Sequence, residues 1–106
     1  MTSQTPEVDV DQLAAALDSG ASLVDVRERG EYAQVHVPGA QLIPMGHLAT
    51  RMDELDKTAP VYVICAGGNR SSAMTDLLRA SGFDAYSVAG GTQAWAASGR
   101  AVGVGL

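Results

Sequence analysis

The chain contains little cysteine, few aromatic residues and an excess of acidic over basic residues, and these shortages exclude several classes of protein. Its 106 residues include one cysteine, so no disulfide can form within the chain. A mechanism that uses two thiols of the same chain is excluded as well. Lys and Arg number 7 against 12 Asp and Glu. The resulting net charge of −5 argues against a nucleic-acid partner, which would require a basic surface.

Long apolar runs and targeting signals are also missing. No apolar run approaches membrane-spanning length, so we expect no membrane partner. The N-terminal residues MTSQTPE contain neither the basic nor the apolar region of a signal peptide. We therefore expect a cytoplasmic protein, with a disordered tail over residues 1–6 and a single domain over residues 7–106.

Short β-branched or apolar runs alternate with helical patterns along the chain. The expected strands are bounded by turn residues and lie at 22–26, 42–43, 61–65 and 85–88. The expected helices follow apolar positions at helical spacing: from an Asp9 cap through Leu17, at 29–35, 47–55 and 71–80, and a short one around Trp95. This alternation predicts an α/β fold with a central parallel β-sheet flanked by helices on both faces.

The first helix carries the clearest local signals. Asp9 followed by Gln12 has the spacing of a capping box, which satisfies backbone N–H groups at a helix N-terminus. Gly20 stands where a helix of this length would end in a left-handed residue. The sequence therefore predicts both ends of this helix.

Cys65 lies where a predicted buried strand gives way to a glycine-containing loop. The loop leads into a helix that Ser71 or Ser72 would cap. A strand, a tight loop and a helix N-terminus in this order point several backbone N–H groups at one spot. These donors would lower the pKa of the thiol and stabilise a thiolate, or an anionic group added to the sulfur.

An inert core cysteine is the alternative interpretation, because free cysteine often behaves as a small buried apolar residue. Gly67 and Gly68 permit unusual backbone angles and a close approach to a ligand, and Arg70 adds a fixed positive charge. An inert cysteine needs none of these neighbours. We therefore favour a nucleophilic Cys65 in an anion-binding loop.

Other charged residues are candidates for supporting roles. Arg70 either faces an anion bound at the sulfur or pairs with a carboxylate such as Asp25 or Glu31, and the sequence leaves both roles open. Asp25 and Arg27 are expected to orient the loop from the adjacent strand. The two histidines, His36 and His47, lack partners at metal-ligand spacing, so no metal site is expected.

Four stretches of the chain, spanning about residues 8–99, resemble the signatures of the rhodanese-like domain family in its single-domain form. The active loop of that family has the pattern Cys-x-x-Gly-x-Arg-Ser/Thr, which is matched here by Cys65, Gly68, Arg70 and Ser71. The other three stretches resemble further signatures in the right order: 23–28, 36–44 and 90–95.

The resemblance implies a sulfurtransferase that moves a sulfane sulfur from thiosulfate or a persulfide to cyanide or a thiol. The sulfur would be carried as a persulfide on Cys65, without a metal or organic cofactor. A protein sulfur acceptor is a further alternative. The implied substrate-binding residues belong to the active-site loop: Ala66, Gly67, Gly68, Asn69, Arg70 and Ser71. Asp25 and Arg27 would support them.

Two other functions are weaker alternatives. The loop from Cys65 to Arg70 holds six residues, the length associated with sulfurtransferases, whereas related cell-cycle phosphatases use a longer loop. An arsenate reductase or phosphatase is therefore less favoured. Rhodanese-like folds also serve as non-catalytic binding or regulatory modules, which often lose the cysteine or distort its loop. Here the loop residues are intact, which favours an enzyme.

Ala66 is a departure from the pattern of many thiosulfate-using members, which carry Arg or Lys directly after the cysteine. Arg70 is then the one cation of the loop. Thiosulfate carries two negative charges, so the loss of a charge-assisted contact would weaken its binding. The sequence therefore predicts poor use of thiosulfate and a preference for a persulfide donor of lower charge.

Overall fold

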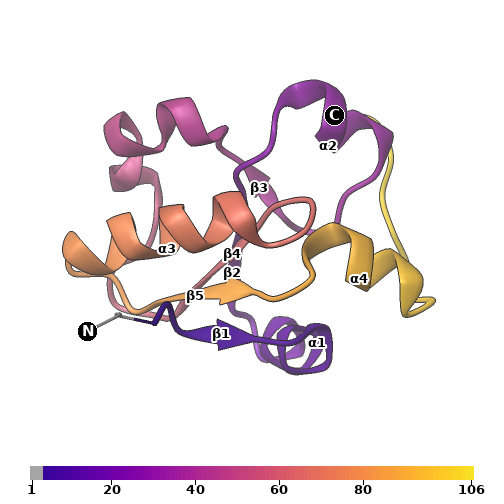
Figure 1. Ribbon diagram of the computed structural model, residues 1–106, viewed down its shortest axis with the longest axis horizontal. Helices are drawn as coiled ribbons and strands as arrows, with labels where there is room; N and C mark the ends of the chain where they lie inside the picture. Colours follow the sequence, from indigo (N-terminus) through magenta and orange to yellow (C-terminus); the bar gives the residue numbers. More distant parts are fainter. Residues whose placement is uncertain (1–3) are drawn as a thin grey trace.

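The strands of the computed structural model, which describes residues 4–106, form one parallel sheet (Figure 1). Over these residues the sheet has five strands in the order β1-β5-β4-β2-β3, and every neighbouring pair is parallel. The strands are β1 (Glu7–Val8), β2 (Ser22–Asp25), β3 (Gln41–Leu42), β4 (Val61–Ile64) and β5 (Ala85–Val88). The predicted fold class is confirmed. The two-residue edge strand β1 was not expected from the sequence.

The helices alternate with the strands as predicted. The α-helices are α1 (Val10–Asp18), α2 (Arg29–Gln34), α3 (Asn69–Ala80) and α4 (Gly91–Ala97), and the 3-10 helices are η1 (Met45–Thr50) and η2 (Met52–Glu54). The capping box of α1 is confirmed, because the Gln12 amide donates to Asp9 Oδ1 at 2.8 Å and the Asp9 amide donates to Gln12 Oε1 at 2.8 Å. None of the helices within residues 4–106 is long and apolar enough to cross a membrane.

The prediction of a helix over residues 47–55 is wrong, because this segment forms the two short 3-10 helices η1 and η2. Its turns close with hydrogen bonds between residues three apart, such as the Arg51 amide to the Leu48 carbonyl at 3.0 Å. Gly46 and the β-branched Thr50 both disfavour a continuous α-helix. The segment instead serves to bury Leu48 completely.

The prediction that Ser71 or Ser72 caps the following helix is also wrong. Helix α3 begins at Asn69, and Gly68 occupies the N-cap with φ of 116°. This left-handed angle strains any residue with a Cβ atom, so glycine is required at the start of the helix. Ser71 consequently lies in the first turn, where its side chain is free to face the cysteine.

The N-terminal segment is in contact with the sheet before the first strand begins. Residues 1–3 of the predicted tail lie outside the described residues. Within residues 4–6, Thr5 Oγ1 donates to Asp76 Oδ1 at 2.8 Å, and the Pro6 carbonyl accepts from the Ser87 amide at 2.9 Å. Contacts with the domain therefore start inside the stretch predicted as a tail.

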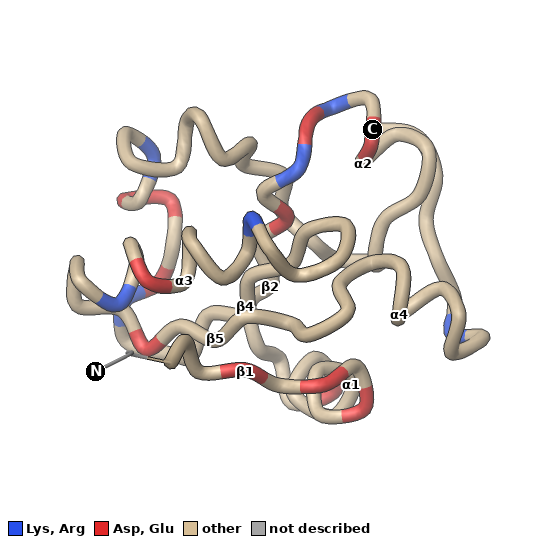
Figure 2. Tube along the Cα trace, in the orientation of Figure 1, with Lys and Arg blue, Asp and Glu red and all other residues tan. Residues whose placement is uncertain are grey.

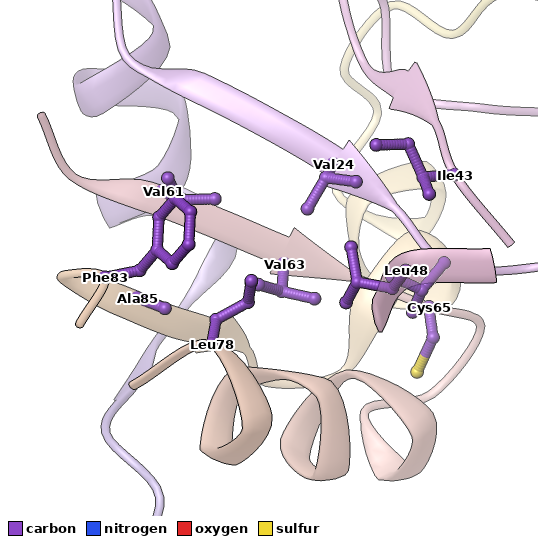
Figure 3. Packing of buried hydrophobic residues seen from close by; sticks show 10 residues of the cluster. Val24, Ile43, Leu48, Val61, Val63, Cys65, Leu78, Phe83 and Ala85 are labelled. Atoms are coloured by element: carbon purple, nitrogen blue, oxygen red, sulfur yellow. The ribbon is translucent and has the colours of Figure 1, made fainter. Parts of the chain in front are cut away.

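The hydrophobic core lies on both faces of the sheet, with α3 and α1 on opposite sides (Figure 1). Alternate residues of β4 face opposite ways, so Val63 packs with Leu78 of α3, whereas Ile64 packs with Leu13 of α1. Cys65 comes next and returns to the α3 side. Figure 3 shows its sulfur at the end of β4, beside the first turn of α3.

The chain changes direction across the sheet between β2 and β4. From β2 it proceeds outward to β3, and from β4 it proceeds the opposite way to β5. In open α/β sheets, ligands bind beyond the carboxyl ends of the strands at such a switch point. Asp25 ends β2 and Cys65 follows β4, so both predicted site residues lie at this position.

Candidate active site

The sulfur of Cys65 lies at the base of a loop whose backbone amides point inward. The Gly68 amide donates to Sγ at 3.1 Å, and the Ser71 amide donates at 3.3 Å. The thiol in turn donates to Ser71 Oγ at 3.4 Å. Cys65 is only 1% exposed, so the sulfur sits in a narrow cradle rather than on an open surface.

The loop keeps its amides inward because helix α4 binds its carbonyl groups from outside. The Thr92 amide and the Thr92 hydroxyl donate to the Cys65 carbonyl at 2.9 and 3.1 Å. The Gln93 amide donates to the Ala66 carbonyl at 3.1 Å. With these carbonyls satisfied on one side, the following peptide groups present their N–H bonds to the sulfur.

Gly91 allows α4 to approach the loop this closely. A Cβ atom at Gly91 would stand 2.5 Å from the carbonyl oxygens of both Cys65 and Ala66, and its φ of 57° is left-handed. A side chain at this position is therefore excluded by contact and by backbone angle together. The sequence identified this glycine as part of a signature. It did not predict that the glycine would lie against the carbonyl groups of the cysteine loop.

The environment of Cys65 makes its thiol more acidic than usual. Burial of the sulfur raises the pKa of Cys65, because it disfavours the charged form. In the thiolate form, hydrogen bonds from the Ser71 hydroxyl and from the Ser71, Gly68 and Gly67 amides outweigh this effect, so the pKa of Cys65 lies below its ordinary value. A lower pKa increases the fraction of nucleophilic thiolate at neutral pH.

Ser87 supports this arrangement from β5, and sequence reasoning missed it. Its hydroxyl lies 2.8 Å from Ser71 Oγ, and both side chains are fully buried. Ser71 Oγ also lies 3.1 Å from the Gly68 carbonyl. The available signal was weak: a serine on a strand that also carries the apolar residues Ala85 and Val88.

Arg70 is paired with Glu31 of α2, which decides between the two roles that the sequence left open. Its two terminal nitrogens donate to the two carboxylate oxygens at 2.8 and 2.9 Å. The hydrogen bond from Arg70 is the main reason why the pKa of Glu31 falls from 4.5 to about 2. Both side chains are about one-third exposed, at 33% and 36%, so the pair lies at the rim of the site.

Asp25 and Arg27 form a second, buried ion pair at the end of β2. The Arg27 Nε donates to Asp25 Oδ1 at 3.0 Å and its Nη2 donates to Oδ2 at 2.8 Å. The same Nη2 donates to the Val35 carbonyl at 2.7 Å. This pair connects the end of β2 to the end of α2, the helix that carries Glu31.

A pocket of about 330 Å³ opens beside the cysteine loop. Its lining residues come from the end of β2, from α2, from the loop and from α4: Arg27, Glu31, Gln34, Val35, Ala66, Thr92, Gln93 and Ala96. Of the predicted loop residues, Ala66 thus forms part of the pocket wall. Asn69 is the first residue of α3. The pocket thus meets the loop at the residue that directly follows Cys65.

The two histidines lie apart from any cluster of metal ligands. No group of three or more His, Cys, Asp or Glu side chains suited to a metal occurs in the described part of the chain. His36 stacks on Tyr32 with ring centroids 3.8 Å apart, and its Nδ1 lies 2.8 Å from the Tyr32 carbonyl. His47 lies on η1.

Known proteins resemble this chain in sequence and in fold. The sequence model of the family described as "Rhodanese-like domain" matches residues 9–98. Thiosulfate sulfurtransferase GlpE of Pseudomonas fluorescens is 38% identical over 82 residues, covering 76% of this chain and 75% of that protein. YrkF of Bacillus subtilis, provisionally named a sulfur carrier protein, is 36% identical over 83 residues, covering 76% of this chain. The chain spans only 45% of the length of YrkF.

Solved structures show the same arrangement of strands and helices. A rhodanese-related protein from Thermoplasma volcanium superposes with a TM-score of 0.88 at 28% identity, covering 93% of this chain and 98% of that one. A rhodanese-like domain protein from Staphylococcus aureus has a TM-score of 0.80 at 35% identity, covering 86% and 91%. Both neighbours match the chain over most of its length.

Proposed function

The chain belongs to the rhodanese-like domain family, and we propose that it is a sulfurtransferase that carries a sulfane sulfur on Cys65. The observation that carries this proposal is the cradle of amides, in which Gly68 and Ser71 donate to the cysteine sulfur. A persulfide is more acidic than a thiol, so its outer sulfur is an anion at neutral pH. Inward-pointing amides stabilise such an anion without having to reorganise.

The proposed reaction has two displacement steps. In the first, the Cys65 thiolate attacks the outer sulfur of the donor and the sulfur–sulfur bond of the donor breaks. Thiosulfate would leave as sulfite, and an organic persulfide RSSH would leave as the thiol RSH with its proton. In the second step, the acceptor attacks the outer sulfur of the Cys65 persulfide, and the thiolate is restored. Cyanide would leave as thiocyanate.

We assign the roles of the site residues on the same basis. Cys65 is the nucleophile, and the backbone amides of the loop from Ala66 to Ser71 bind the transferred sulfur. Asp25 and Arg27 hold the end of β2 and α2 in place as a buried pair. A cytoplasmic location agrees with a mechanism that requires the single cysteine to stay reduced.

The acceptor is a small thiophile, cyanide or a thiol, or a protein that receives sulfur. The relatives support this range, because one is named a thiosulfate sulfurtransferase and another is provisionally named a sulfur carrier. The burial of Cys65 is compatible with a small acceptor and with a protein acceptor, since the outer sulfur of the persulfide would extend beyond the buried sulfur of the cysteine.

Intact mass spectrometry tests the proposal directly. The purified protein is measured before and after incubation with thiosulfate or with an organic persulfide, and again after addition of cyanide. We expect a gain of one sulfur atom from at least one donor, and its loss to cyanide as thiocyanate. The matched control is Cys65→Ser, which should neither gain sulfur nor transfer it while keeping its fold by circular dichroism. Absence of loading from both donors would exclude the proposed activity and favour a binding module.

A further inference from the structure

We propose that Glu31 is a donor-specificity residue: by pairing with Arg70, it leaves the sulfur site without a free cation and so disfavours donors that carry two negative charges. This inference rests on the proposed sulfur transfer and deepens it. It assigns the donor to the class of low-charge organic persulfides rather than thiosulfate.

The Glu31 carboxylate is held in place from two sides. Arg70 donates to both of its oxygens, at 2.8 and 2.9 Å, which is the two-pronged geometry that arginine forms with carboxylates. The Glu28 amide donates to Glu31 Oε1 at 3.0 Å from the start of α2. The carboxylate is therefore fixed over the guanidinium, and turning Arg70 toward an anion would break both of its hydrogen bonds.

The remaining charges around the pocket are paired as well. Arg27 is 4% exposed, and its guanidinium is bound to Asp25 and to the Val35 carbonyl. Ala66, directly after the cysteine, contributes no charge. Each of the two arginines that flank the loop is thus matched by a carboxylate. Among the described residues that line the pocket, an incoming anion meets no unpaired positive side chain, and the cradle offers it backbone amides.

A dianion and a monoanion respond differently to such a site. Entering a buried cradle strips both of water, and the cost grows steeply with charge. Neutral amides compensate for less of this cost than a charged guanidinium would. Thiosulfate is a dianion and gains little here, whereas a persulfide with an uncharged body carries a single charge at neutral pH and no charge in the protonated form RSSH, which the thiolate attacks.

The walls of the pocket suit such an organic body. Apart from the paired charges, the lining is uncharged and includes two side-chain amides, Gln34 and Gln93, beside Val35 and Ala96. Amide side chains can both donate and accept hydrogen bonds, which matches the peptide-like groups of a cysteine derivative. The volume of about 330 Å³ is larger than a thiosulfate ion requires.

The test compares two donors in the full chain. The values of kcat/KM for thiosulfate and for N-acetylcysteinamide persulfide are measured in the unmodified protein and in Glu31→Gln, with cyanide as acceptor. Glutamine keeps the shape but leaves Arg70 with its charge unpaired. We expect kcat/KM for thiosulfate to rise about tenfold, the effect of gaining one hydrogen bond to a charged group. The value for the persulfide should change by less than about twofold.

Glu28→Gln is the matched control. It changes the net charge by the same amount, three residues before Glu31, and removes no contact of Arg70. It should leave the ratio of kcat/KM for thiosulfate to kcat/KM for the persulfide unchanged. If Glu31→Gln unfolds, Glu31→Ala removes the same carboxylate and is measured instead. Ala66→Arg adds a cation by a different route and should also raise thiosulfate use.

The outcomes separate this inference from the function on which it rests. An unchanged donor ratio in a folded Glu31 variant would overturn the role of Glu31, even where Ala66→Arg improves thiosulfate use. An equal rise for Glu31→Gln and Glu28→Gln would also overturn it, because net charge alone would then explain the effect. If the unmodified protein takes sulfur from neither donor, the proposed function itself fails.

Discussion

At the scale of single residues, the acidity of Cys65 depends on one adjustable donor among several fixed ones. The Gly68 and Ser71 amides belong to the backbone and keep their directions. The Ser71 hydroxyl can rotate: it accepts from the thiol, and it donates to the sulfur once the thiol has lost its proton. The Ser71 hydroxyl also donates to the Gly68 carbonyl at 3.1 Å and lies 2.8 Å from Ser87 Oγ, so these groups compete for its hydrogen.

We predict that Ser71→Ala raises the pKa of the Cys65 thiol, because the thiolate loses its hydroxyl donor while the backbone amides stay. The thiolate is populated above this pKa and disappears as the pH falls through it. The acid limb of the activity profile should therefore move to higher pH. Thiolate absorbance in the ultraviolet, followed against pH, measures the change.

Ser72→Ala is the control for this prediction, since Ser72 occupies the same first turn of α3 but makes no hydrogen bond to the sulfur. Its titration should match that of the unmodified protein. A Ser71 variant that titrates like the Ser72 variant would show that the backbone amides alone set the acidity.

The sequence identified Cys65 and the order of the residues in its loop, but not every residue that the fold brings next to that cysteine. Cys65 and its loop follow one another in the chain, so a local pattern was enough to identify them. Glu31 and Arg70 are 39 residues apart, and their contact depends on where α2 packs. Ser87 reaches the site through the pairing of β5 with β4, which no local pattern encodes.

At the scale of elements, the cradle depends on the close approach of α4 to the loop after β4. Thr92 and Gln93 hold the loop carbonyls from outside, and Gly91 leaves room for them to do so. The first turn of α4 is therefore a structural part of the site, and its hydrogen bonds go to the loop carbonyls.

We predict that Gly91→Ala destabilises the protein by about 3 kcal/mol or more, because a Cβ atom would overlap two backbone oxygens at a left-handed φ. Gly99→Ala is the matched control: its φ of 81° is also left-handed, but no atom lies within 4 Å of the added Cβ. It should cost only about 1 kcal/mol. Urea unfolding measures both variants, and equal losses would contradict the proposed contact.

Elements with strong local signals were predicted well, and elements shaped by packing were not. The ends of α1 follow from Asp9, Gln12 and Gly20, and these signals are read directly from the chain. The 3-10 helices form in place of an expected α-helix because Gly46 and Thr50 disfavour a continuous α-helix, in a segment that buries Leu48. Helix α3 begins at Asn69, before the predicted serine cap, because Gly68 supplies a backbone angle that permits an earlier start.

At the scale of the whole molecule, charge is unevenly distributed. Acidic residues gather along β1 and α1, whereas acidic and basic residues alternate around the start of α2 (Figure 2). The net charge of −5 still dominates at a distance, because the arginines beside the site are paired. An anionic donor therefore approaches a weakly repelling protein.

We predict that kcat/KM for thiosulfate rises by about twofold when ionic strength increases from about 0.01 M to about 0.15 M, because salt screens this repulsion. Alkylation of Cys65 by uncharged iodoacetamide serves as the control and should show no such dependence. A fall in kcat/KM with salt would mean that a positive field around the site outweighs the net charge.

The overall architecture was accessible from the sequence because the alternation of strands and helices allows few arrangements. Parallel strands joined by helices must be covered on both faces, and their carboxyl ends gather the site residues. The pocket beside the loop was not accessible, because Val35, Ala66 and Gln93 meet there only after folding.

The depth of Cys65 also determines the order in which large and small molecules can act. The thiol is 1% exposed, and an added sulfur would stand about 2 Å farther out. In the proposed cycle, only the terminal atom of a slender donor reaches the empty thiol, whereas a bulky acceptor can reach the outer sulfur. A protein acceptor would thus distinguish the protein with a persulfide on Cys65 from the protein with a free thiol, because it can contact only the outer sulfur. Such a depth difference lets a protein partner engage the sulfur-loaded site in preference to the empty one, without any movement of the fold.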